Sequence, residues 1–119
     1  MSDPLDATLT VTPLADGVSL TLILTVENVG QDSFDLSFPD GQRAEFVAVD
    51  EEESEVWRWS NGRAFSMALG SETLVPGESV GYEAEWSSPP PGEYEVTGSL
   101  AASNADASAT MTVVVPKTE

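Results

Sequence analysis

The chain has 119 residues, of which 21 are Asp or Glu and only 4 are Lys or Arg, giving a formal net charge of −17. It contains no His and no Cys, which excludes His-based triads, Cys nucleophiles and the usual zinc and iron–sulfur ligand sets. The negative charge argues against partners rich in phosphate, both nucleic acid and anionic membrane. We therefore expect one non-enzymatic domain without a cofactor.

The excess of carboxylates also predicts the conditions under which the chain is stable. Surface carboxylates repel one another over a screening length of about 10 Å in dilute salt, but over only about 3 Å in molar salt. Because 40% of the residues are apolar and alternate regularly, a disordered acidic chain is not expected. The sequence predicts a folded halophilic domain. It has neither a bilayer-spanning run nor a secretory signal, so we expect it in the cytoplasm.

Apolar and polar residues alternate along most of the chain, and no helical period is sustained. The alternation predicts strands over residues 5–11, 20–26, 34–38, 43–49, 55–60, 80–86, 93–100 and 109–115. Residues 65–69 either complete a hairpin across Asn61-Gly62 or form a brief irregular piece. Turn residues separate the strands at Asp16-Gly17, Asn28–Gln31, Pro39–Gly41, Pro76-Gly77 and Ser103–Asp106.

About eight or nine short strands, spaced by about ten residues, are typical of an all-β protein. We predict an immunoglobulin-like two-sheet antiparallel β-sandwich, with one domain over residues 5–116 and loose termini at residues 1–4 and 117–119.

The placement of the few basic residues is informative. Arg43, Arg58 and Arg63 fall within one window of 21 residues. Each could be held structurally, by an ion pair or on a Trp face. The functional alternative is a small positive patch on a negative body, which would receive an acidic partner.

Trp57 and Trp59 lie two residues apart, so in a strand they share one face while Val56 and Arg58 share the other. We favour tryptophans that point into the sandwich, which leaves Arg58 outside. The alternative is an exposed Trp pair that forms a binding surface. The neighbouring segment 50–55 has five carboxylates in six residues but no calcium-loop spacing, and it is predicted to be a solvated tip.

Two motifs carry a family resemblance. They are Phe38-Pro-Asp-Gly-Gln-Arg-Ala-Glu-Phe-Val-Ala-Val-Asp50 and Glu55-Val-Trp-Arg-Trp-Ser-Asn-Gly-Arg-Ala-Phe65. Their most specific parts are Gly-Gln-Arg and Val-Trp-Arg-Trp-Ser-x-Gly-Arg. Together with shorter matches elsewhere over residues 8–100, they closely resemble the intracellular proteinase inhibitor (BsuPI) family of bacteria and archaea. The acidic composition is similar to that of a haloarchaeal member.

The resemblance implies an immunoglobulin-like sandwich inside the cell that is able to inhibit a serine, subtilisin-like proteinase. Inhibition requires an exposed loop that is already held near its bound conformation. We predict that Arg63 is offered to the specificity pocket of the proteinase. The predicted partner-binding residues around it are Asn61, Gly62, Ala64, Arg43, Trp57, Arg58 and Trp59.

Two alternatives stay open. The proline-rich loop from Ser88 to Gly92 is a second candidate contact loop. The domain could also be a non-inhibitory interaction or scaffold module, which would add an edge strand to a protein partner through main-chain hydrogen bonds.

Overall fold

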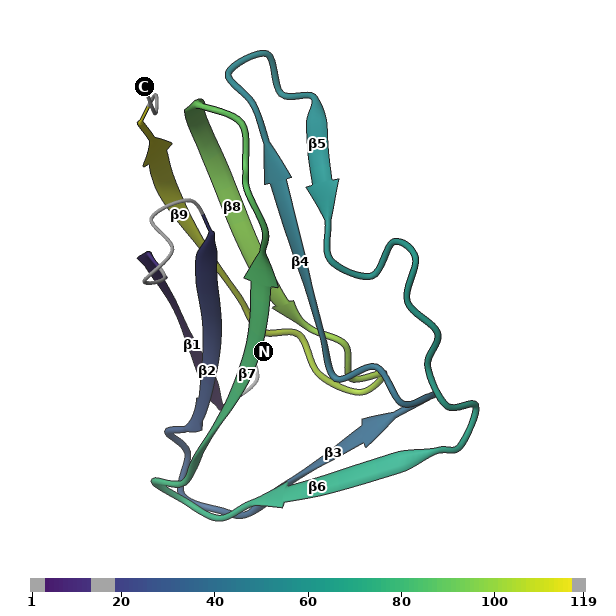
Figure 1. The fold of residues 1–119 in the computed structure, drawn as a ribbon. Helices are drawn as coiled ribbons and strands as arrows, with labels where there is room; N and C mark the ends of the chain where they lie inside the picture. The colour runs from purple at the N-terminus through teal and green to yellow at the C-terminus, as the bar shows by residue number, and fades with distance from the viewer. Residues whose placement is uncertain (1–3, 14–18, 117–119) are drawn as a thin grey trace.

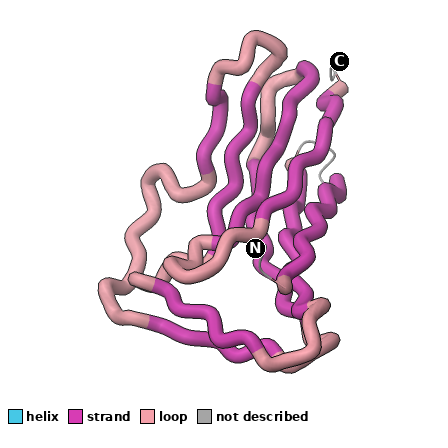
Figure 2. Tube along the Cα trace, turned by 180° about the vertical axis from the view of Figure 1, so that it is seen from behind, coloured by secondary structure: helices cyan, strands magenta, loops and turns pink. Residues whose placement is uncertain are grey.

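The computed structural model describes residues 4–13 and 19–116, and in these residues it contains strands and loops but no helix (Figures 1 and 2). The strands are β1 (Leu5–Pro13), β2 (Leu20–Asn28), β3 (Phe34–Phe38), β4 (Ala44–Val49), β5 (Glu55–Arg58), β6 (Gly70–Leu74), β7 (Ser79–Trp86), β8 (Gly92–Leu100) and β9 (Ser108–Val115). All their pairings are antiparallel.

The strands form three sheets. A three-stranded sheet has the order β1-β2-β7 and a four-stranded sheet has the order β5-β4-β8-β9. These two sheets are the layers of the sandwich, while the two-stranded sheet β3-β6 lies across one end, at the bottom of Figure 1. The all-β sandwich is therefore confirmed. The separate third sheet was not predicted.

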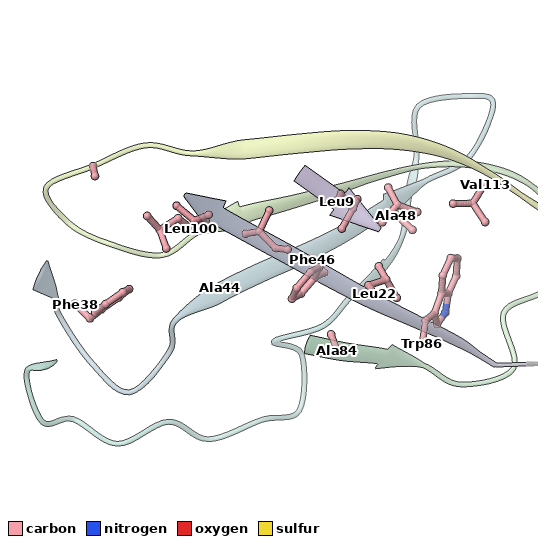
Figure 3. Close-up of a cluster of buried hydrophobic side chains, with 14 of the residues drawn as sticks. Leu9, Leu22, Phe38, Ala44, Phe46, Ala48, Ala84, Trp86, Leu100 and Val113 are labelled. Carbon is pink, nitrogen blue, oxygen red and sulfur yellow. The ribbon is translucent and has the colours of Figure 1, made fainter. Parts of the chain in front are cut away.

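Most of the core lies between the two larger sheets, and it extends to the third sheet through Leu36, Phe38 and Leu74 (Figure 3). Leu22, Leu24 and Val26 alternate along β2 and are completely buried, as are Ala48 and Val96 of the opposite sheet. This arrangement follows from the period of two along a strand, which turns every second side chain toward the same face. Burial of each large aliphatic side chain contributes about 1.5–3 kcal/mol.

Asn28 joins the third sheet to the sandwich. Its side chain is completely buried, and its amide donates to the carbonyl oxygens of Leu74 (2.8 Å) and Asp32 (2.9 Å). Its side-chain oxygen accepts a hydrogen bond from the Gly30 N–H at 2.9 Å. The predicted turn at Asn28 thus depends on a buried amide that holds the end of β2 against the end of β6.

The hairpin across Asn61-Gly62 is not formed. The chain does turn there, because the Arg63 N–H donates to the Ser60 carbonyl at 3.1 Å and Gly62 has φ of 79°. However, β5 ends at Arg58, and residues 65–69 are irregular. The ninth strand is instead β6, which pairs with β3 from Phe34↔Leu74 to Phe38↔Gly70.

The ends of the chain and the first predicted turn fall largely outside the described residues. Asp16-Gly17 and the termini 1–3 and 117–119 belong to these undescribed parts. Pro4 was predicted to be loose, but its carbonyl oxygen accepts a hydrogen bond from the Val29 N–H at 2.9 Å. Pro4 is therefore attached to the turn that follows β2.

Candidate functional site: the β5–β6 connection

The β5–β6 connection, residues 59–69, is the longest segment between two strands in the described part of the chain. It runs along the side of the sandwich toward the β3-β6 sheet (Figure 1). Two large apolar side chains near its end are open to solvent: Met67 is 90% exposed and Leu69 is 84% exposed. Contacts with the sandwich and with the β3–β4 turn hold the conformation of this exposed segment.

The start of the connection is fixed by Trp59. The main-chain N–H of Trp59 donates to the Phe46 carbonyl at 2.9 Å. Its ring packs edge-on against the Phe46 ring, with 6.1 Å between centroids, and contacts the Phe65 ring at a tilt of 47°, with 5.6 Å between centroids. Because Phe46 belongs to the core, the first residue of the connection is anchored directly in the sandwich.

Glu45 provides a second anchor at the same place. One carboxylate oxygen, Oε1, accepts hydrogen bonds from the main-chain N–H groups of Ser60 (3.1 Å) and Phe46 (3.0 Å). Burial by itself raises the pKa of Glu45, but hydrogen bonds from Ser60, Phe46 and Gln42 outweigh it and hold that pKa below its usual value. The carboxylate is thus ionised at neutral pH and fixes the turn after β5.

The middle of the connection is held by Gly41, in the turn between β3 and β4. The Gly41 N–H donates to the Ser66 carbonyl at 2.7 Å. A Cβ atom at position 41 would lie 2.9 Å from the Ser66 nitrogen, closer than packed atoms normally approach. Only glycine therefore permits this contact.

Arg43 holds the end of the connection. Its guanidinium lies 4.4 Å from the centroid of the Phe38 ring, and its Nη1 donates to the Asp40 carbonyl at 2.8 Å. On the β6 side the guanidinium occupies the space that a side chain at Gly70 would need. Arg43 is therefore packed between β3 and β6, on a Phe ring instead of the predicted Trp face, and it lies apart from the other predicted site residues.

The tryptophans point inward, which confirms the favoured alternative. Trp57 and Trp59 both pack against the core, and the Trp57 ring stacks on Trp86 of β7 with 5.1 Å between centroids and 12° between planes. Arg58 lies on the outer side, where it pairs with Glu55 at 2.6 Å and with Glu45 at 3.5 Å. These contacts tie β5 to both sheets.

Six of the predicted site residues meet around one surface hollow of about 550 Å³ between β5, the following turn and β7. They are Trp57, Arg58, Trp59, Asn61, Gly62 and Arg63. The Arg63 guanidinium lies 4.5 Å from the centroid of the Trp59 ring, and its Nε donates to the Trp59 carbonyl at 2.9 Å. Ala64 is exposed next to it. Arg63 is thus drawn back onto the connection.

The charge of this region differs from that of the rest of the chain. Residues 56–71 contain no Asp or Glu, although the chain has 21 of them, and this is its longest acid-free stretch. The same stretch includes Arg58 and Arg63. Within residues 59–69 Arg63 is the one charged residue, while Glu85 from β7 lines the neighbouring hollow and Arg58 is paired with Glu45 and Glu55.

The sequence analysis placed the contact at Arg63 and did not include Met67 or Leu69, the two exposed apolar side chains of the connection, in the predicted site. The signal that could have found them was the acid-free stretch itself, which extends beyond the turn to the start of β6. The exposure of apolar residues could not be predicted, because alternation alone does not distinguish an irregular exposed piece from a strand.

The second candidate loop, between β7 and β8, is held close to the body. Its Pro89 is buried, and the Tyr94 hydroxyl donates to the Pro90 carbonyl at 2.7 Å. The described residues include no cluster of His, Cys, Asp or Glu arranged to hold a metal ion. Within that same part of the chain there is also no helix that could cross a membrane.

The fold and the site together define a small β-sandwich that presents one long, anchored and exposed connection. A family model described as intracellular proteinase inhibitor, BsuPI, matches residues 5–105, and the chain belongs to this family. The resemblance found in the sequence motifs is thereby confirmed. The family is one of inhibitors rather than enzymes. No curated protein matches the chain.

Solved structures support the fold. The chain is similar to Spo0M, a sporulation control protein from Bacillus subtilis, with 15% identity and a TM-score of 0.57 over 97% of this chain and 50% of Spo0M. It is also similar to β-glucosidase 3B from Thermotoga neapolitana, with 19% identity and a TM-score of 0.51 over 95% of this chain and 16% of that enzyme. The chain thus spans half of the first protein and a small part of the second. At these identities the likeness concerns the fold alone.

Proposed function

We propose that this protein inhibits an intracellular serine proteinase of the subtilisin type, and that the β5–β6 connection is the surface that contacts the proteinase. The observation that carries the proposal is the anchored exposure of residues 59–69: Trp59, Ser66 and Gly70 are each held by the body, while Met67 and Leu69 face solvent. A contact loop that is ordered before binding loses little conformational entropy when it binds.

A titration tests this function. Purified subtilisin, whose active sites have been counted, is mixed with increasing amounts of the protein in molar KCl, and the residual hydrolysis of a peptide substrate is measured. We expect activity to fall in proportion to the protein added. Full activity at a micromolar excess of folded protein would overturn the proposal.

We further propose that the protein works in a salt-rich cytoplasm. A net charge of −17 favours an expanded chain when screening is weak, and molar salt removes most of that repulsion. The midpoint of thermal unfolding should therefore rise by several degrees between dilute buffer and molar KCl. A midpoint that is independent of KCl concentration would contradict this proposal.

A non-inhibitory interaction module is the alternative, and β9 favours it. In the described part of the chain this strand pairs only with β8 and is therefore an edge of its sheet, and its Val114 is 67% exposed. An edge strand can receive a partner strand through main-chain hydrogen bonds. Affinity capture from lysate separates the two functions. A proteinase in the bound fraction supports inhibition. A non-proteinase partner that binds the wild-type protein but not the Val114→Lys variant supports the interaction module.

A further inference from the structure

Met67 lies between two peptide groups of the connection, and each of these groups makes one hydrogen bond. Before it, the Ser66 carbonyl accepts the hydrogen bond from Gly41 at 2.7 Å. After it, the Ala68 N–H donates to the Ser66 hydroxyl at 3.0 Å. The backbone before Met67 is thus bonded to the body at Gly41 and the backbone after it to the neighbouring Ser66 side chain, although the Met67 side chain is 90% exposed.

The main chain of Met67 is also available to a partner. Within the described residues, its own N–H and C=O take part in no hydrogen bond. Peptides that lie in an extended binding cleft are recognised through such main-chain groups, while pockets in the cleft read the side chains. Met67 therefore offers both kinds of contact at one position.

The side chain of Arg63 is not free to make such contacts. Its guanidinium is engaged with the Trp59 ring and its Nε with the Trp59 carbonyl. Both contacts must break before the side chain can extend into a pocket. Arg63 and Trp59 instead stabilise the turn that leads into the exposed part of the connection.

The chemistry of the exposed part selects the kind of pocket. Met is unbranched and polarizable, so it fills apolar pockets of varied shape. Leu69 adds a second exposed apolar side chain two residues later, and no carboxylate occurs between residues 56 and 71. We propose that Met67 is the residue that enters the primary specificity pocket of the target proteinase, and that this pocket is apolar; the inference rests on the proposed inhibitory function.

Inhibition constants against subtilisin in molar KCl test the inference. Met67→Asp should raise the inhibition constant on the order of tenfold or more, because a buried apolar anchor dominates such contacts. Met67→Leu, which conserves volume and polarity, should change it by less than about threefold. Arg63→Ala should raise it less than Met67→Asp does, because it removes only contacts that stabilise the turn. Circular dichroism confirms that each variant is folded. A larger effect of Arg63→Ala than of Met67→Asp would overturn the assignment.

The position of the first cleavage separates failure of this inference from failure of inhibition. With a large excess of subtilisin, we expect hydrolysis of the Met67–Ala68 peptide bond. The oxygen of water becomes part of the new carboxylate of Met67, and a proton goes to the new amine of Ala68. Mass spectrometry identifies the two fragments. Cleavage there without inhibition supports recognition of Met67 and overturns the proposed function. Inhibition that is unaffected by Met67→Asp, with first cleavage elsewhere, overturns only the Met67 assignment. If the protein neither inhibits subtilisin nor is cleaved at this bond, the proposed function and the Met67 assignment are both overturned.

Discussion

The sandwich and the β5–β6 connection distribute polarity in opposite ways. In the sandwich, aliphatic side chains such as Leu22 and Val96 are buried between the sheets, and carboxylates such as Glu83 and Glu95 are exposed. In the connection, Met67 is exposed and acidic residues are absent. Because like charges repel, the acid-free connection would meet less repulsion from an acidic partner than the carboxylate-bearing strands, which supports its proposed role in contact. The comparison separates residues that we expect to determine stability from residues that we propose to determine binding.

The largest expected effect tests the stability side of this comparison. Phe46→Ala removes a ring that is 1% exposed and that also supports Trp59, and it should lower the free energy of unfolding by about 3–5 kcal/mol. Met67→Ala is the matched control and should change it by less than about 0.5 kcal/mol. Urea unfolding in molar KCl measures both. Equal losses would show that Met67 is packed and not free.

Asn28 tests how much the junction between the third sheet and the sandwich contributes to stability. Asn28→Ala leaves the Leu74 carbonyl and the Gly30 N–H without the partners described above. We expect the free energy of unfolding to fall by about 1–3 kcal/mol for each group that stays buried and unpaired. Asn61→Ala, at an exposed position, should be nearly neutral in the same unfolding measurement. A neutral Asn28→Ala would mean that water replaces the amide.

Most of the sandwich could be predicted from sequence because its strands keep a strict alternation. Leu22, Leu24 and Val26 in β2 are the clearest case, since all three are buried as the period of two requires. β6 was missed because Gly70–Leu74 has only one buried aliphatic residue, Leu74, among small and polar ones. Its pairing with β3 depends on contacts distant in sequence.

The candidate site was predictable in place but not in detail. The Trp and Arg motif predicted a group of residues of which six do meet around one hollow, and their part in binding stays a prediction. Sequence could not show that Arg63 would fold back onto Trp59 or that Arg43 would pack between Phe38 and Gly70. These are tertiary choices among several partners that each Arg could have taken.

Gly41 tests whether the fixed conformation of the connection matters for binding. Gly41→Ala places a Cβ against the Ser66 backbone, so the connection must shift. We expect the inhibition constant to rise about tenfold, which corresponds to about 1.4 kcal/mol, with a smaller loss of stability. Gly81→Ala is the control, because a Cβ there would only touch Ile23 at an ordinary 3.6 Å. Unchanged inhibition by Gly41→Ala would show that the target itself orders the connection.

The smallest expected effect comes from the pH dependence of Glu45. Its pKa is lowered in the folded state, so its contribution is fully present above the unfolded pKa, near 4.5, and is lost as the pH falls through the lower folded value. Acidification also reduces the net negative charge, which acts in the opposite direction. The effect of Glu45 must therefore be measured as a difference between variants.

Glu45→Gln should lower the free energy of unfolding at neutral pH by about 1 kcal/mol or less, because the Arg58 pair that it weakens is partly exposed. The gap between wild type and this variant should close as the pH falls below the unfolded pKa of Glu45. Glu83→Gln, in β7, removes the same charge without touching the connection and should show no such closing gap. A constant gap for Glu45→Gln across that pH range would mean that hydrogen-bond geometry, and not the charge of Glu45, fixes the start of the connection.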